Sequence, residues 1–130
     1  MQFALFDENP LAHIQKNTVL YTGTHDNDTS IGWFRALEDE LSKDEINNIR
    51  EQLDLNSKEV NWSMIEYSFL SKAQTVIIPI QDLLGLGSEA RMNTPGTISD
   101  TNWSWRMSAS VLTDSMKEKM KKITKKAKRI

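Results

Sequence analysis

Two short apolar runs, at residues 18–21 and 75–80, constrain the fold of this 130-residue chain more than any other feature. Both are rich in β-branched residues and continuous rather than alternating, which is typical of strands buried on both faces of a parallel sheet. The sequence between them has helical periodicity. A strand, a helical crossover and a second strand predict a right-handed parallel connection, so we expect an α/β fold.

Three helices are expected in the crossover, because apolar residues recur there at spacings of three and four. Ser42 and Glu45 have the spacing of a capping box, which opens the second helix. Asn61 is expected to be the N-cap of the third. The apolar positions are Trp33, Phe34, Leu37 and Leu41 in the first helix, Ile46, Ile49 and Leu53 in the second, and Trp62, Ile65, Phe69 and Ala73 in the third.

The remaining elements lie at the two ends of the chain. Residues 3–6 are expected to form one more strand, and the stretch after 75–80 a long glycine- and proline-rich connection with at most a helical turn at 88–92. A terminal amphipathic helix is expected at about 108–128. No linker divides the chain, so residues 1–130 are expected to form one unit. The apolar stripe of the terminal helix is Leu112, Met116, Met120, Ile123 and Ala127.

Composition excludes several classes of protein. There is no cysteine, which excludes thiol nucleophiles and disulfides, and the start of the chain lacks a signal peptide or membrane span, so a cytoplasmic location is expected. Residues 111–130 carry eight basic and two acidic residues, whereas residues 1–110 carry eight and sixteen. No aromatic residue interleaves the lysines. A solvated helix face is therefore favoured over a nucleic-acid or membrane surface.

Polar side chains follow both strands at the point where each strand ends. The segment 22–29 delivers His25, Asp26, Asn27 and Asp28, and the segment 81–96 delivers Gln81, Asp82 and then Asn93, Pro95 and Gly96. Because ligand sites in parallel α/β folds lie at the carboxyl ends of the strands, both loops are expected to face one cleft.

A purely structural role is the alternative for each of these side chains. Asn and Asp favour turns and helix caps, and this role is preferred for Asn27 and Asp28. For Asp26 beside His25, spacing alone is equally compatible with structure and with chemistry. Planar polar groups suit sugar hydroxyls, and Trp103 or Trp105 could pack on a pyranose ring, although tryptophans more often pack in cores.

No metal or cofactor is expected. The chain has only two histidines, His13 and His25, without a His-x3-His pair or the spacing of a calcium-binding loop. Phosphate-binding and Gly-x-Ser-x-Gly motifs are also missing from the sequence. The sequence therefore contains no motif that indicates nucleotide binding or serine hydrolase chemistry.

Three segments resemble the C-terminal part of the bacterial amylomaltases, which are the 4-alpha-glucanotransferases of glycoside hydrolase family 77. They are YTGTHDNDT at 21–29, QDLLGLGSEARMNTPGT at 81–97 and NWSWR at 102–106. The resemblance extends over about residues 1–107. It implies a (β/α)8 barrel that transfers α-1,4-glucan segments between malto-oligosaccharides by a retaining mechanism. A complete barrel needs roughly 250 residues, so an incomplete barrel with about three parallel strands is expected.

The resemblance also implies roles for individual residues. Asp26 resembles the family's aspartate that stabilises the transition state, and His25 its sugar-binding neighbour. Asn93, Pro95 and Gly96 resemble part of the glucan-binding loop. The family's nucleophile and acid/base belong to earlier strands, so the spare carboxylates, including Asp82, take neither role.

These implications lead to two functional hypotheses for the chain. The first is a glucanotransferase segment that is inactive without the rest of the barrel. The alternative is a non-catalytic α-glucan-binding fragment or module. In both cases the unpaired edges of a partial barrel predict a marginally stable or associating chain.

Overall fold

The centre of the fold is a pair of parallel strands, as the sequence predicted. The computed structural model describes residues 14–55 and 58–129. Strand β1 (Val19–Tyr21) pairs with β2 (Thr75–Ile77), and Leu20 lies opposite Val76. The expected strand at residues 3–6 and His13 lie outside the described residues. The described residues thus confirm a mixed α/β fold with a parallel βαβ connection.

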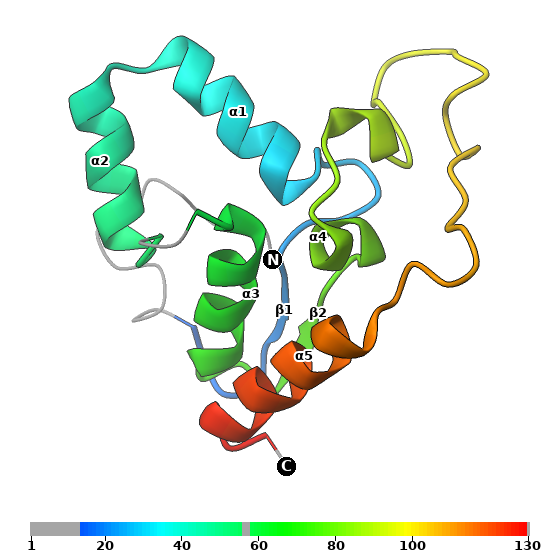
Figure 1. Cartoon of the computed structure of the whole chain (residues 1–130). Helices are drawn as coiled ribbons and strands as arrows, with labels where there is room; N and C mark the ends of the chain where they lie inside the picture. Colours follow the sequence, from blue (N-terminus) through cyan, green and yellow to red (C-terminus); the bar gives the residue numbers. More distant parts are fainter. Residues whose placement is uncertain (1–13, 56–57, 130) are drawn as a thin grey trace.

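Three helices form the crossover and lie together on one side of the strands in Figure 1. Segment 91–112 arches on the other side. The helices are α1 (Ser30–Glu40), α2 (Lys43–Gln52) and α3 (Val60–Leu70); after β2 follow α4 (Ile80–Leu84), the short 3-10 helix η1 (Ser88–Ala90) and α5 (Asp114–Lys126).

Apolar packing explains why the crossover helices form close to where the periodicity predicted them, although Ala73 lies beyond the end of α3. Phe34 of α1, Ile46 of α2 and Met64 of α3 belong to one buried cluster. The predicted capping box is present in α2, where the hydroxyl of Ser42 accepts from the Glu45 amide at 3.4 Å. The Ser42 amide donates to the Glu45 carboxylate at 2.9 Å. Both local caps and tertiary burial therefore favour the same helix.

The N-cap prediction for Asn61 is wrong. Asn61 lies inside α3, whose N-cap position is Glu59 and has no side-chain cap hydrogen bond. The Asn61 side chain is buried and donates from Nδ2 to the carbonyl of Asp82 at 2.9 Å. A buried amide gains more from this tertiary partner than from an exposed cap, because its polar atoms cannot reach water.

The strand predicted at residues 75–80 is longer than β2, and helix α4 was not predicted. Strand β2 ends at Ile77, and Pro79 becomes the N-cap of α4 with a φ of −56°. Its carbonyl accepts from the Asp82 amide at 3.0 Å. Proline has no N–H to give to a sheet and is preorganised for a helix start, so it ends the strand. The short turn expected at 88–92 is confirmed by η1.

The terminal helix is shorter than the predicted 108–128. It begins after Thr113, whose hydroxyl accepts from the Met116 amide at 3.2 Å. Ser110 has a φ of 66°, which is incompatible with a right-handed helix. Leu112 therefore precedes the helix and is exposed. The apolar stripe otherwise packs as predicted, with Ile123 buried beside Trp62 of α3.

Helix α5 packs against α3 (Figure 1). Basic residues in and just after α5 contact α3 in addition to facing solvent. Lys119 pairs with Glu59 and lies 4.4 Å from the centre of the Trp62 ring. Arg129 donates to the carbonyls of Phe69 and Ser71 at 2.7 and 3.0 Å, which satisfies the end of α3. Within the described part of the chain, no helix is long and apolar enough to span a bilayer.

Candidate functional site

The two polar loops meet, as expected from their positions after parallel strands. We call residues 22–29 the first loop and residues 91–97 the second loop. Asn93 donates from Nδ2 to Asp26 Oδ1 at 2.7 Å, and its amide donates to the carbonyl of His25 at 3.1 Å. Arg91 donates to the Asp26 carbonyl at 3.2 Å. The second loop therefore holds Asp26 by both backbone and side chain.

His25 and Asp26 remain open to solvent although their positions are fixed. Their side chains are 56% and 49% exposed, and His25 Nε2 lies 3.3 Å from Asp26 Oδ2. One carboxylate oxygen of Asp26 faces Asn93 and the other faces His25. An oriented carboxylate with free accessible surface can accept hydrogen bonds from a polyhydroxylated ligand.

Asp82 anchors the first loop, a role that the sequence did not predict. Its carboxylate is 2% exposed and accepts from Thr22 Oγ1 at 2.6 Å and from the Ser30 amide at 2.7 Å. Thr22 is the first residue of the loop that carries His25 and Asp26, and Ser30 directly follows its last residue. Asp82 therefore clamps both ends of that loop. Only its place directly after an expected strand, beside Gln81, hinted at this role.

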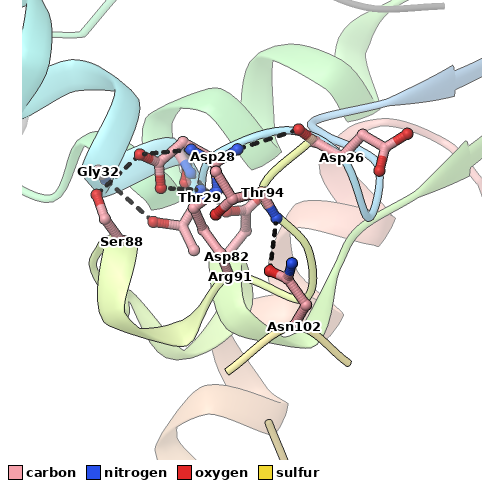
Figure 2. Close-up of polar contacts among 10 residues, drawn as sticks. Asp26, Asp28, Thr29, Gly32, Asp82, Ser88, Arg91, Thr94 and Asn102 are labelled. Atoms are coloured by element: carbon pink, nitrogen blue, oxygen red, sulfur yellow. Dashed lines mark hydrogen bonds and ion pairs between the residues drawn. The ribbon is translucent and has the colours of Figure 1, made fainter. Parts of the chain in front are cut away.

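Asn27 and Asp28 have the structural roles preferred from the sequence. The side-chain oxygen Oδ1 of Asn27 accepts from the amide and hydroxyl of Thr24, both at 2.9 Å, which closes the turn. Asp28 accepts from Ser88 Oγ at 2.8 Å and lies 3.6 Å from Arg91, so it joins the first loop to η1 and the second loop (Figure 2). The cap of α1 itself is Thr29.

Gly32 permits this junction. A Cβ at position 32 would lie 2.3 Å from Ser88 Oγ and 2.4 Å from Asp28 Oδ1. Only a residue without a side chain lets the first turn of α1 approach the Asp28–Ser88 hydrogen bond so closely.

The structure does not bring Pro95 and Gly96 into contact with the first loop. Both are exposed and form the tip of a turn in which the Thr97 amide donates to the Thr94 carbonyl at 3.3 Å. Gly96 has a φ of 73°, as the third residue of a type II turn requires. Asn102 accepts from the Thr94 amide at 3.0 Å and so braces the turn (Figure 2).

An open pocket of about 550 Å³ lies at the carboxyl ends of β1 and β2. Tyr21 and Ile77 line it from the strands, whereas His25, Gln81 and Arg91 line it from the segments that follow. Its volume is in the range of small-ligand sites. In the part of the chain that the structure describes, no group of three or more His, Cys, Asp or Glu residues could hold a metal ion.

The two tryptophans near the site differ in exposure. Trp103 is 53% exposed, and its ring centre lies 5.1 Å from that of His25 at an interplanar angle of 40°. Trp105 is partly buried. Of the two, Trp103 is thus the one whose ring adjoins a predicted site residue.

Comparison with known proteins gives consistent matches. The model of the family described as 4-alpha-glucanotransferase matches residues 1–113. The chloroplastic/amyloplastic 4-alpha-glucanotransferase of Arabidopsis thaliana is 46% identical over 101 residues, covering 77% of this chain and 17% of that protein. The 4-alpha-glucanotransferase of Synechocystis sp. is 43% identical over 106 residues, covering 81% of this chain and 20% of that protein.

A solved structure matches the fold. The amylomaltase from Streptococcus agalactiae, in complex with acarbose, superimposes with a TM-score of 0.83 at 29% identity, covering 97% of this chain and 26% of that one. The chain thus spans about a fifth of the length of these curated relatives. Since the family model covers residues 1–113 and the fold agrees, the chain belongs to the 4-alpha-glucanotransferase family, glycoside hydrolase family 77.

Proposed function

We propose that this chain is the C-terminal portion of a 4-alpha-glucanotransferase barrel, which transfers α-1,4-glucan segments between malto-oligosaccharides by a retaining mechanism. The observation that carries the proposal is the Asp26 carboxylate, fixed by Asn93 at 2.7 Å and still half exposed beside His25. A site for a neutral sugar needs such an oriented acceptor more than it needs a deep apolar cavity.

Asp26 would act as the transition-state stabiliser. A glycosyl ring flattens and gains positive charge as its glycosidic bond breaks, and hydrogen bonds from its hydroxyls to an anion strengthen at that moment. The bond from Asn93 limits the rotation of the Asp26 carboxylate, so little reorganisation is needed. His25 and Asn93 would hold neighbouring hydroxyls of the same substrate.

Pro95 and Gly96 would form the rim of the glucan groove. They lie on an exposed turn whose backbone is braced by Asn102 at two points, Thr94 and Thr97. A braced turn can present a fixed surface to a bound chain at low entropic cost. The resemblance of this turn to the glucan-binding loop of the family supports the assignment.

We infer that the barrel is completed by polypeptide beyond this chain. Val19 and Ile77 are 43% and 45% exposed and, by the register of the sheet, lie on its same face as Tyr21. In a complete barrel such positions are covered by side chains from other strands. The nucleophile and acid/base would come from those strands. The chain alone would then be inactive and prone to associate, and its lack of cysteine fits a cytoplasmic location.

Disproportionation of maltotriose tests the proposal. We expect no activity from the chain alone, and activity when it is combined with the complementary N-terminal portion of the Synechocystis relative. In that complex, Asp26→Asn should lower kcat by about a hundredfold or more, as removal of one transition-state interaction does. Asp28→Asn is the matched control and should have a much smaller effect, because Asp28 is occupied by Ser88. Equal activity of Asp26→Asn and the unsubstituted complex would refute the proposal.

The alternative function is binding of α-glucan without catalysis. The exposed Trp103 ring beside His25 favours it, because an aromatic face can bind sugar whether or not chemistry follows. Titration with maltoheptaose, followed by tryptophan fluorescence, separates the two hypotheses. Saturable binding by the chain alone, with no disproportionation by the complex, would favour the binding module.

A further inference from the structure

Trp103 is an exposed aromatic residue held against the candidate site. Its amide donates to the carbonyl of Met92 at 2.5 Å, which ties it to the start of the second loop. Its ring centre lies 5.1 Å from that of His25, and His25 lines the pocket. The ring therefore extends the pocket rim with an apolar surface that remains 53% exposed.

The backbone at Trp103 is strained. Its φ is 63°, in the left-handed region that bulky residues rarely adopt. Trp105, two residues further on, has no positive φ. Strained residues persist only where the surroundings impose them, and they concentrate at functional sites. Burial of the Trp103 ring is too small to explain why a tryptophan occupies this position.

Side-chain hydrogen bonds impose the conformation from both directions. On the N-terminal side, Asn102 accepts from the Thr94 amide at 3.0 Å (Figure 2). On the C-terminal side, Arg106 donates to the carbonyls of Trp103 and Trp105 at 3.1 and 2.8 Å. The ring is thus presented by a preorganised segment, which lowers the entropic cost of binding a ligand.

We propose that Trp103, together with His25, forms a stacking platform for the glucan unit next to the one held by Asp26 and Asn93. This inference rests on the proposed function and adds a binding residue to it. One face of a pyranose ring carries C–H groups that pack on an aromatic ring, while its equatorial hydroxyls point outward to polar partners. Trp103 supplies the apolar surface, and the neighbouring carboxylate and amide supply the polar edge.

If Trp103 is retained for ligand binding despite its strained backbone, two results are expected. Removal of the ring should weaken binding and should cost less stability than removal of a fully buried aromatic side chain, because Trp103 is 53% exposed. Glycine should be more stable than alanine at this position, because both lack the ring and only glycine relieves the left-handed backbone. If Trp103 were instead retained for packing, its replacement by either alanine or glycine would be strongly destabilising.

The experiment compares Trp103→Ala, Trp103→Gly and Trp103→Phe in the full chain, by calorimetric titration with acarbose and maltoheptaose and by thermal unfolding. Ala and Gly should each weaken binding by about tenfold, and Phe by less, since it keeps an aromatic face. The Tm of Trp103→Gly should exceed that of Trp103→Ala by about 3 °C or more. Trp105→Phe is the matched control and should leave affinity unchanged.

Each outcome bears on the proposal. Equal affinity of Trp103→Ala and the wild type would overturn the stacking platform and leave the proposed function intact. A wild-type chain that binds neither sugar would overturn the stacking platform, whereas the proposed function is decided separately by disproportionation in the reconstituted complex. A fall of more than about 10 °C in the Tm of both Ala and Gly variants would assign Trp103 to packing and overturn the platform as well.

Discussion

The crossover helices and the 91–112 segment are stabilised in opposite ways. In α1–α3 the organising side chains are apolar and buried, such as Phe34, Ile46 and Met64. In the 91–112 segment several large apolar side chains are exposed, among them Ile98 fully and Trp103 by half. That segment is held by hydrogen bonds from Asn93, Asn102 and Arg106. Stability and the proposed glucan binding would thus depend on different regions, so substitutions in each should affect different measurements.

The largest expected effect is in the helical core. Ile65 is 0% exposed, and Ile65→Ala should lower the free energy of unfolding by about 3 kcal/mol, because it removes apolar contacts and leaves a cavity. Ile98→Ala, in the other region, is the matched control and should change it by less than about 0.5 kcal/mol. Urea unfolding of both variants provides the measurement. Equal losses would contradict the division between the two regions.

The next effect is at Asp82, whose carboxylate holds the first loop to the start of α1. Asp82→Ala leaves the Thr22 hydroxyl and the Ser30 amide without their buried acceptor and should cost about 2 kcal/mol. Asp82→Asn keeps one acceptor oxygen and should cost less. Asp100→Ala, at an exposed aspartate of the 91–112 segment, is the control. If urea unfolding showed a loss of about 2 kcal/mol for Asp100→Ala and none for Asp82→Ala, the clamp by Asp82 would be refuted.

A smaller effect is expected at the cap of α2. Ser42→Ala should lower the free energy of unfolding by about 1 kcal/mol at neutral pH, the usual value for loss of an N-cap. The Ser42 hydroxyl and amide hold the pKa of Glu45 below its ordinary value. A lowered folded pKa contributes stability above the unfolded pKa, and this stability is lost as pH falls through the folded pKa. The difference between variant and wild type should therefore shrink in acid.

The smallest effect on stability, with a large effect on binding, is expected at Asn93. Asn93→Ala should change the free energy of unfolding by less than about 0.5 kcal/mol, because the side chain is near the surface. It should nevertheless weaken binding of acarbose by about tenfold, since Asp26 loses its orienting partner. Asn48→Ala, on the exposed face of α2, is the control in the same calorimetric titration. If Asn93→Ala bound acarbose as tightly as the wild type, Asn93 would have no role in the proposed site.

The sequence predicted the helical region better than the loops. The faces of α1 and α2 and the capping box at Ser42 follow from local spacing, and the packing in the structure agrees with that spacing. Helix α4 was missed because five residues are too few to show periodicity, and because Ile78-Pro79-Ile80 continues an apolar run. Local pattern also misassigned Asn61, whose partner Asp82 lies 21 residues away.

The location of the candidate site could be predicted from the sequence, but the residues that hold its loops in place could not. Parallel strands placed both loops at one edge, so the meeting of Asp26 and Asn93 followed from topology. The clamp by Asp82 and the left-handed backbone of Trp103 depend on contacts and torsions that no spacing encodes. Residues that support a site from beneath are therefore the ones that sequence reasoning most easily overlooks.

Amide NMR of the full chain during titration with acarbose tests the central claim, that the two polar loops and Trp103 form one glucan site. We predict the largest shifts for the side-chain amide of Asn93 and the indole N–H of Trp103, and almost none for the side-chain amides of Asn47 and Asn48 in α2. Shifts at saturation that are confined to the helices, with Asn93 and Trp103 unaffected, would contradict the account.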